Sequence, residues 1–310
     1  MRVFVAGATG AIGRALVPLL LEAGHEVTGM TRSAERASEL ERTGAEAVVA
    51  DALEADAVRQ AVAAASPEVV VHQLTALPQR IDPRKLERDF ALNDRLRSEG
   101  TAILVDAARE AGARRVIAQS IAFMYEPGPP GTVHDEQDPL LEHPPPAFAR
   151  TRDAVATLER TVLAADGVVL RYGYFYGPGT ALSGSGSTGA DLRRRRFPVV
   201  GRGTGVWSLI HIRDAARATV AALTHGTSGT YNIVDDHPAQ VAEWLPALAR
   251  AIGAPRPLRL PAWVARLAAG SYGVEVMTRA QGASNARARA DLGWQPELPS
   301  WREGFAADLG

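Results

Sequence analysis

The first half of the chain alternates short apolar runs with amphipathic stretches. The apolar runs consist mostly of Val, Ile, Leu and Ala, with little polar alternation. This pattern is typical of strands that are covered by helices on both faces. We therefore predict strands over residues 2–6, 26–31, 45–50, 68–73, 115–120 and 168–172.

Between these runs, apolar side chains recur at the spacing of helices that bury one side. Strands and helices that alternate in this order predict an α/β fold, a doubly wound parallel sheet of the Rossmann type. Such a sheet binds its ligand at the carboxyl ends of the strands. The predicted helices cover residues 11–23, 34–43, 54–65, 83–111 and 147–165.

A glycine-rich loop joins the first predicted strand to the first predicted helix. It reads Gly7-Ala8-Thr9-Gly10-Ala11-Ile12-Gly13. In this setting the first glycine permits a tight turn, the second lets a diphosphate approach the backbone, and the third packs the helix on the strand. The free N–H groups of the helix start favour an anion. The loop therefore predicts a dinucleotide site.

The alternation of strands and helices ends after Tyr176, where a Gly-Pro-Gly turn and a Gly/Ser-rich stretch follow. Further strands are predicted at 207–212 and 231–234, and the rest of the chain is helical with Pro-rich joints. We predict a dinucleotide-binding domain over 1–176, to which 207–236 returns, and a smaller C-terminal substrate-binding lobe formed by 177–206 and 237–310.

Composition narrows the classes of partner and site. The 310 residues are 46% hydrophobic and carry a formal net charge of −1, so no excess charge attracts nucleic acid or an anionic membrane. The chain has no cysteine, which excludes disulfides and cysteine-bound metals. No apolar run approaches the ~20 residues that cross a bilayer. We expect a cytoplasmic protein with a small-molecule substrate, no nucleic-acid or membrane partner and no metal.

The end of the second predicted strand bears on the choice between NAD and NADP. An NAD site usually places a carboxylate there to bind the ribose. This chain has Thr31 and Arg32 instead, with Arg36 one helical turn later. Two guanidinium groups suit a 2′-phosphate, so we expect NADP, with NAD possible. The alternative is that both arginines are ordinary solvated residues. Asp51 is placed either to meet the adenine or to cap the next helix.

Motifs across nearly the whole chain resemble those of the extended short-chain dehydrogenases/reductases, the NAD-dependent epimerase/dehydratase family. The resemblance implies a homodimer through the helices at 83–111 and 147–165, and a cofactor site that also includes Ala52, Leu74, Thr75 and Tyr172. The motifs are Gly7 to Gly13, Asp51, Gly100-Thr101, residues 115–120, Leu170-Arg171 through Gly179, Ile210 to Asp214, Tyr231-Asn232 and Leu292 to Pro296.

The resemblance also implies a reaction centre. In the family, a serine and a Tyr-x-x-x-Lys pair move the substrate proton while a hydride passes to or from the nicotinamide. Ser120 ends the fifth predicted strand, where the family places its serine, although such a hydroxyl can also satisfy local backbone. The family's helix asparagine is displaced, because Arg97 stands three residues before Gly100 and Asn93 lies one turn earlier.

The Tyr/Lys pair itself is missing, since Lys85 is the only lysine of the chain. An arginine in its place can bind ribose but cannot shuttle a proton, because its pKa lies above about 12. The usual mechanism of carbonyl reduction is therefore in doubt. One register of the predicted helix puts Phe148 and Arg152 at the two positions, and another puts Thr151 and Val155 there, so neither supplies a phenol.

Tyrosines elsewhere are candidates to replace the missing acid. Tyr172, Tyr174 and Tyr176 alternate along the last predicted parallel strand and its exit, which puts their hydroxyls on one side if the strand stays regular. By resemblance Tyr172 lies near the nicotinamide amide and Tyr174 towards the substrate, and we select Tyr174 as the catalytic candidate. Tyr125 is a further candidate. The alternative is that these rings only line an apolar pocket.

Three other polar clusters allow two interpretations each. His211 and Asp214 have the residue types of a catalytic pair, but we expect a strand end and a helix cap. The acidic stretch at 134–138 lacks metal-ligand spacing, so we expect a solvated loop. The arginines at 193–196 are either a solvated face or a clamp for an anionic substrate.

Three functions remain open on these residues. The first is an NADP-dependent oxidoreductase that acts on a small or medium organic substrate without the usual Tyr/Lys pair. The second is a dehydratase, isomerase or cyclase that uses the same pocket. The third is an inactive NADP-binding sensor. The retained substrate-side motifs favour an enzyme over a sensor.

Overall fold

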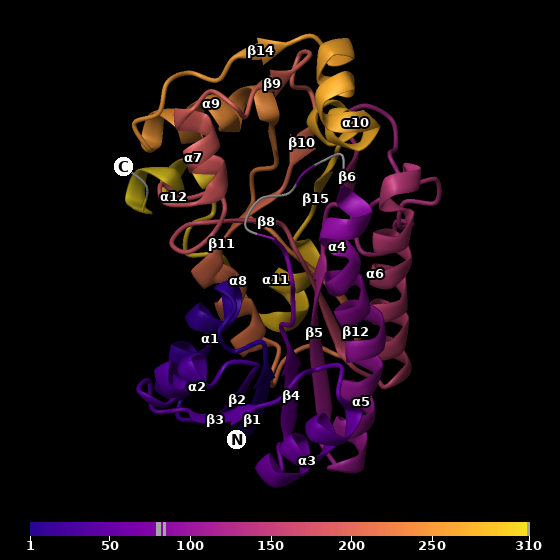
Figure 1. Cartoon of the computed structure of the whole chain (residues 1–310), viewed down its shortest axis with the longest axis vertical. Helices are drawn as coiled ribbons and strands as arrows, with labels where there is room; N and C mark the ends of the chain where they lie inside the picture. The colour runs from indigo at the N-terminus through magenta and orange to yellow at the C-terminus, as the bar shows by residue number, and fades with distance from the viewer. Residues whose placement is uncertain (79–81, 83–84, 309–310) are drawn as a thin grey trace.

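A computed structural model describes residues 1–78, 82 and 85–308. Its centre is a parallel sheet in the order β12-β7-β5-β4-β1-β2-β3 (Figure 1). The strands are mostly buried as predicted, apart from the partly exposed edge strand β3. The doubly wound fold is confirmed. The strands are β1 (Arg2–Ala6), β2 (Glu26–Thr31), β3 (Glu46–Val49), β4 (Val69–His72), β5 (Arg115–Ile121), β7 (Val168–Tyr172) and β12 (Gly229–Ile233).

Helices bury their apolar sides on both faces of this sheet. On one face Leu16 and Leu20 of α1 pack with Ala215 of α8 and Leu292 of α11. On the other, side chains of α3, α5 and α6 form a second core. The helices are α1 (Ala11–Glu22), α2 (Ala34–Glu41), α3 (Ala55–Ala65), α4 (Leu86–Arg95), α5 (Thr101–Glu110), α6 (Pro146–Ala164), α8 (Ile212–Ala221) and α11 (Ala286–Leu292).

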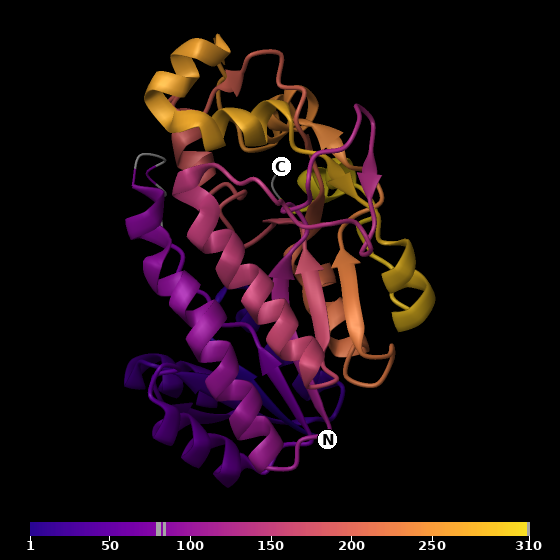
Figure 2. The same ribbon diagram turned by 90° about the vertical axis from the view of Figure 1, so that its right-hand side faces the viewer.

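The helix predicted over 83–111 is not continuous. Its predicted start at Pro83 lies outside the described residues, and a π-helical turn, η1 (Leu96–Gly100), separates α4 from α5. The Thr101 hydroxyl donates to the carbonyl oxygen of Arg97 at 2.6 Å, a local bond that competes with the regular helical ladder. Both helices still lie beside α6 (Figure 2).

A smaller body lies above the carboxyl ends of the strands, as the arrows in Figure 2 show. Its core gathers Trp207, Trp244, Leu245 and Phe305. Helix α10 bends at Gly270, whose φ is +70°. The elements are α7 (Ser187–Arg193), α9 (Val241–Ala251), α10 (Ala262–Thr278), α12 (Trp301–Asp308) and the pairs β6 (Val133–His134) with β15 (Gly282–Ala283), β8 (Tyr174–Tyr176) with β11 (Leu209–His211), β9 (Val199–Val200) with β14 (Arg259–Leu260), and β10 (Val206–Trp207) with β13 (Ala239–Gln240).

The strand predicted over 207–212 is divided into β10 and β11, which pair with different partners. Because β10 and β11 belong to the upper body and α8, which follows at Ile212, packs on the main sheet, this segment connects the two parts of the molecule. In the part of the chain that the structure describes, no helix has the length and apolar character needed to cross a bilayer.

Candidate functional site

The glycine-rich loop allows a ligand to approach the protein backbone closely. Two of its glycines, Gly7 and Gly13, have no space for a side chain. Gly7 has a φ of +89°, and a Cβ atom there would lie 2.5 Å from the carbonyl oxygen of Gln73. A Cβ atom at Gly13 would lie 2.4 Å from the carbonyl oxygen of Ala8. Helix α1 starts at Ala11 with no side-chain cap and no acidic residue in its first turn. Its N–H groups are therefore suited to a diphosphate.

The predicted 2′-phosphate site lies at the end of β2. The hydroxyls of Thr9 and Thr31 are 3.3 Å apart, which ties the glycine loop to this strand end. The side chains of Arg32 and Arg36 are exposed and make no hydrogen bond or ion pair with any residue that the structure describes. Two free guanidinium groups thus flank Ser33, whose hydroxyl caps α2.

The other predicted cofactor contacts follow β3 and β4 at the same edge of the sheet. The Asp51 carboxylate accepts a hydrogen bond from the N–H of Leu53 at 3.0 Å, so it caps the turn before α3 while lying at the predicted adenine edge. Ala52 is buried and Thr75 is exposed. The N–H of Leu74 donates to Nδ1 of His72, as described below. Contact of these residues with a cofactor stays a prediction.

Ser120 lies in a buried polar network. Its hydroxyl donates to Oε1 of Glu159 at 2.6 Å, and Glu159 also pairs with Arg171 at 2.6 Å. Arg171 donates in turn to the Tyr125 hydroxyl, which donates to the side-chain oxygen of Asn232. The Ser120 hydroxyl therefore has a structural partner, and no contact among the described residues supports its predicted catalytic role.

The three alternating tyrosines do not share one side, which corrects our expectation. The N–H of Gly173 bonds to the large sheet at Ile233, whereas that of Tyr174 bonds to Ser208. The chain therefore leaves the sheet at Gly173 and the alternation is broken. The Tyr172 hydroxyl bonds to Thr219 at 2.7 Å, inside the core on the α1 side of the sheet.

The other two rings lie in the upper body. Tyr176 is fully buried, with its ring against Phe305. Tyr174 is stacked between Phe123 and Trp207, with ring centroids 4.1 and 3.8 Å away. Burial raises the pKa of the Tyr174 hydroxyl well above its ordinary value, so this phenol holds its proton tightly.

Phe148 of one predicted register and Val155 of the other lie in an apolar environment. Phe148, Ile121, Met124 and Val155 form one buried cluster. Ile121 directly follows Ser120 on β5, and both residues meet α6, Ile121 through this cluster and Ser120 through Glu159. Tyr272 of α10 stacks on Phe148 with centroids 4.1 Å apart, and burial raises its pKa above the ordinary value.

The polar residues of the two helix registers are tied to neighbours. The Thr151 hydroxyl donates to Oδ2 of Asp94 at 3.0 Å. Arg152 pairs with exposed Asp153 at 3.1 Å, while its Nε atom is buried without a partner among the described residues. Neither register brings a phenol from α6 to the site.

The π-helical turn is fixed to the end of β4 by a short chain of hydrogen bonds. The N–H of Leu74 donates to Nδ1 of His72 at 3.2 Å, so the ring proton lies on Nε2. This Nε2 is 2.9 Å from the Thr101 hydroxyl, which donates to the Arg97 carbonyl. Burial, with a smaller effect from the Arg97 charge, lowers the pKa of His72 to about 4.

The remaining candidates have structural contacts. The Asp214 carboxylate accepts from the N–H groups of Glu297 and Leu298 at 2.9 and 3.0 Å, rather than from His211. Arg193 donates to the carbonyl oxygen of Gly184.

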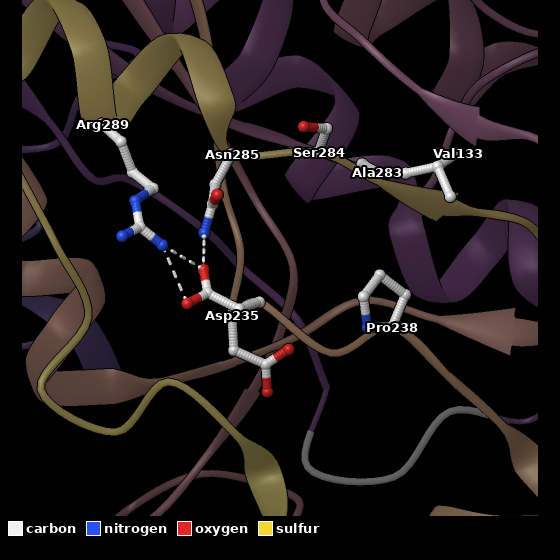
Figure 3. A pocket seen from close by; sticks show the side chains of 8 residues that line it. Val133, Asp235, Pro238, Ala283, Ser284, Asn285 and Arg289 are labelled. Carbon is white, nitrogen blue, oxygen red and sulfur yellow. Dashed lines mark hydrogen bonds and ion pairs between the residues drawn. The ribbon is translucent and has the colours of Figure 1, made fainter.

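A pocket of about 400 Å³ lies away from these residues, between β6, β15 and the start of α11 (Figure 3). Its charged groups are mostly paired. Asp236 accepts from Arg289 at 2.9 Å and from Asn285 at 2.8 Å. Burial raises the pKa of neighbouring Asp235 to about 8, and its carboxylate accepts from the N–H of Trp301. These contacts join β12 to α11 and α12, so we assign this pocket no reaction.

Sequence reasoning overlooked Tyr272 and Ile121. Tyr272 lies in a C-terminal helix whose spacing carries no sign of its contact with α6. Ile121 was overlooked because the hydroxyl of the preceding residue, Ser120, was taken as the functional group.

Comparison with known proteins gives the following matches. The family described as NAD dependent epimerase/dehydratase family matches residues 3–234. A 3-diazoavenalumate denitrifying reductase from a Streptomyces species is 50% identical over 99% of this chain and 100% of its own length.

Two solved structures share the fold. The UDP-glucose 4-epimerase of Thermus thermophilus in complex with NAD is 23% identical, with a TM-score of 0.78 over 100% of this chain and 98% of that one. Human epimerase family protein SDR39U1 with NADPH is 23% identical, with a TM-score of 0.75 over 100% and 99% of the two chains.

Proposed function

Since the chain belongs to the NAD dependent epimerase/dehydratase family, we propose that it uses NADPH to reduce an aromatic diazo compound with release of dinitrogen. The chain is an NAD(P)-dependent oxidoreductase of the short-chain dehydrogenase/reductase type. The name of the 50% identical relative suggests the diazo class of substrate. The apolar cluster around Phe148 carries the proposal, because it fits a reduction that consumes no proton.

Proton balance distinguishes this reaction from carbonyl reduction. A ketone takes up a hydride and a proton, so its enzyme needs a proton donor beside the carbonyl oxygen. An aryl diazonium cation takes up a hydride alone and gives an arene and dinitrogen. In this chain Phe148 and Val155, which the two registers of α6 put at the positions of the family's Tyr/Lys pair, form an apolar cluster with Ile121. A site without a donor favours the diazonium and disfavours the ketone.

Bound NADPH would supply the hydride from C4 of its nicotinamide. The terminal nitrogen of the diazonium accepts this hydride, which gives a neutral aryl diazene. Loss of dinitrogen from the diazene breaks the carbon–nitrogen bond and leaves its hydrogen, as a proton, on the ring carbon. Hydride, proton and electrons balance without a side-chain acid. The role left to the chain is to hold the ring and exclude water.

Aromatic side chains support an aromatic substrate. The stacked rings of Phe123, Tyr174 and Trp207 and the stacked pair Phe148 and Tyr272 belong to the region above the sheet. We assign Tyr174 to substrate lining rather than proton transfer, because burial makes its hydroxyl a poor acid.

The free guanidinium groups of Arg32 and Arg36 support NADPH over NADH. Replacing both with Ala is expected to weaken NADPH binding by about tenfold or more, because hydrogen bonds to a charged group contribute about 1.5–3 kcal/mol each. NADH binding should change little. Arg42→Ala, on the exposed end of the same helix, is the matched control. Fluorescence titration of both nucleotides measures the effect, and equal losses for the two would remove this assignment.

The reaction is tested with a diazonium salt made from an aminohydroxycinnamate that carries ¹⁵N in the diazo group. We expect NADPH oxidation, labelled dinitrogen and denitrified arene in a 1:1:1 ratio. Reactions without protein, and with heat-denatured protein, correct for direct reduction by NADPH. Mass spectrometry of the headspace and chromatography of the solution provide the three measurements.

Three outcomes would contradict the proposal. Oxidation of NADPH by a panel of ketones, with no acceleration by the diazonium, would indicate a relocated proton donor. Turnover without nicotinamide oxidation would favour the dehydratase, isomerase or cyclase alternative. NADPH binding without any turnover in either panel would favour a sensor.

We also propose a homodimer through α4, α5 and α6, as in our expectation from the family resemblance. A groove between α4, η1 and α6 carries Arg95, Glu99 and Arg150, which suits a polar interface rim. Light scattering at micromolar concentration tests this, and a monomeric mass would contradict it. The cytoplasmic location stays a prediction.

A further inference from the structure

Arg97 is a buried cation for which the described part of the chain provides no partner. Its side chain is on the π-helical turn η1, and the residue is 5% exposed. The guanidinium forms no hydrogen bond or ion pair with any described residue. Burial lowers the pKa of this group to about 10, yet it remains charged at neutral pH. Buried charges in proteins are normally paired, so an anion is missing from this position.

Among the described residues, no acidic neighbour forms an ion pair with Arg97. Its charge is influenced by Asp94, Tyr272 and Glu159. Glu159 already neutralises Arg171 at 2.6 Å. Asp94 accepts from Thr151 through Oδ2, and burial raises the pKa of its carboxyl group. Tyr272 keeps its proton. None of these groups supplies the missing counter-ion at contact distance.

The surroundings of Arg97 form the proposed reaction site. The hydrogen bonds from His72 through Thr101 hold the Arg97 backbone over the end of β4. Tyr272 of the upper body stacks on Phe148 of α6, and α6 packs against η1, which carries Arg97. On α4 and α6, which pack against η1, further buried polar atoms lack partners among the described residues, namely Nδ2 of Asn93, Oδ1 of Asp94 and Nε of Arg152. A polar ligand group is therefore expected beside the apolar cluster.

We propose that Arg97 binds a carboxylate of the substrate and makes the enzyme selective for aromatic acids. This inference rests on the proposed function for the reaction. The ligand group, a carboxylate, is inferred from the unpaired guanidinium. The planar fork of an arginine matches the two oxygens of a carboxylate. A carboxylate on an aromatic frame would meet Arg97 while its ring meets Phe148 and Tyr272.

The first experiment compares an acid with its amide. We expect the Arg97→Gln variant to raise the KM of the diazonium acid at least about tenfold, and to leave the KM of the corresponding amide unchanged. Arg59→Gln is the matched control, because Arg59 lies on α3, is exposed and pairs with Asp56. Equal losses for acid and amide would overturn the proposal. A loss of NADPH affinity would assign Arg97 to the cofactor and overturn it as well.

The second experiment does not depend on turnover. Binding of 4-hydroxycinnamate and of 4-hydroxycinnamamide to the NADP⁺-loaded protein is measured by calorimetry. We expect the wild type to prefer the acid and Arg97→Gln to lose this preference. If the acid binds but no diazonium is reduced, the reaction is wrong and the site is right. If acid and amide bind equally to the wild type, the site is wrong.

A stability measurement separates ligand binding from a structural role. Arg97→Met removes the unpaired charge and keeps an unbranched apolar side chain, so it is expected to raise the melting temperature of the ligand-free protein. It should also abolish the preference for the acid. A lower melting temperature would show that Arg97 stabilises the fold, and would contradict the inference that its charge lacks a counter-ion.

Discussion

Acid should destabilise this protein through His72, and His72→Gln should remove that effect. The imidazole is 1% exposed, and it connects Leu74 to Thr101 through its two nitrogens. A glutamine can reproduce both contacts, because its oxygen accepts and its nitrogen donates. It cannot be protonated. The substitution therefore tests the charge state of His72 with little change in its hydrogen bonds.

The size of the effect follows from the lowered pKa. In the unfolded chain His72 titrates near 6.5, and in the folded protein near 4. Above pH 6.5 both states are neutral and the full stability is present. As the pH falls below 6.5 the unfolded state gains a proton that the folded state refuses, so stability is lost until the pH reaches about 4. At 1.36 kcal/mol for each pH unit, the loss at pH 4.5 is about 2.5 kcal/mol.

Urea denaturation at pH 7.5, 5.5 and 4.5, followed by tryptophan fluorescence, measures this difference. Other groups titrate in the same range, Asp235 among them, but they contribute equally to both proteins and cancel in the comparison. Wild type should lose about 2.5 kcal/mol relative to His72→Gln between pH 7.5 and 4.5. Parallel stability curves for the two proteins would refute the reasoning, because they would mean that His72 has the same pKa in the folded and the unfolded state.

Three further substitutions test the packing and the site. Gly13→Ala should lower stability by about 1–3 kcal/mol and weaken NADPH binding, because its Cβ meets backbone oxygens at 2.4 Å; thermal unfolding and titration with NADPH measure both, and normal binding would contradict it. Glu159→Gln leaves the buried Arg171 unpaired and should cost about 3–5 kcal/mol in urea unfolding; an unchanged midpoint would deny the pair a structural role. Phe148→Tyr with Arg152→Lys should not raise diazonium turnover, whereas a large gain would indicate a decayed carbonyl-reducing site.

The main sheet could be predicted because its elements are governed by local pattern. Continuous apolar runs, each followed by an amphipathic stretch, located the strands to within about two residues. The exceptions are positions where a single local contact overrides the pattern. Thr101 bonds to the Arg97 carbonyl and divides a predicted helix, and Gly173 changes strand partner from Ile233 to the neighbour at Ser208. Neither change alters the periodicity of hydrophobic residues, so the sequence pattern does not reveal it.

The candidate site was harder to predict, since its members come from elements distant in the chain. Tyr272 of α10 meets Phe148 of α6, and only the packing of the upper body brings them together. The direction of a strand-end side chain was a second difficulty. Ser120 was selected for its hydroxyl, but that hydroxyl donates to Glu159 of α6, and the next residue, Ile121, joins the Phe148 cluster. Residue type alone does not reveal which neighbour a strand-end side chain meets.

In the proposed reaction, the unpaired charge of Arg97 and the apolar cluster around Phe148 place a joint requirement on the substrate. A diazonium is cationic, so Arg97 repels it by about 2 kcal/mol at a separation of about 8 Å with an effective dielectric constant of about 20. A carboxylate on the same molecule is attracted to Arg97 and neutralises its charge. The substrate that fits both features is therefore zwitterionic, with its carboxylate at Arg97 and its diazonium directed away, towards the nicotinamide side. Binding of the carboxylate at Arg97 then fixes the orientation in which the diazonium group is reduced.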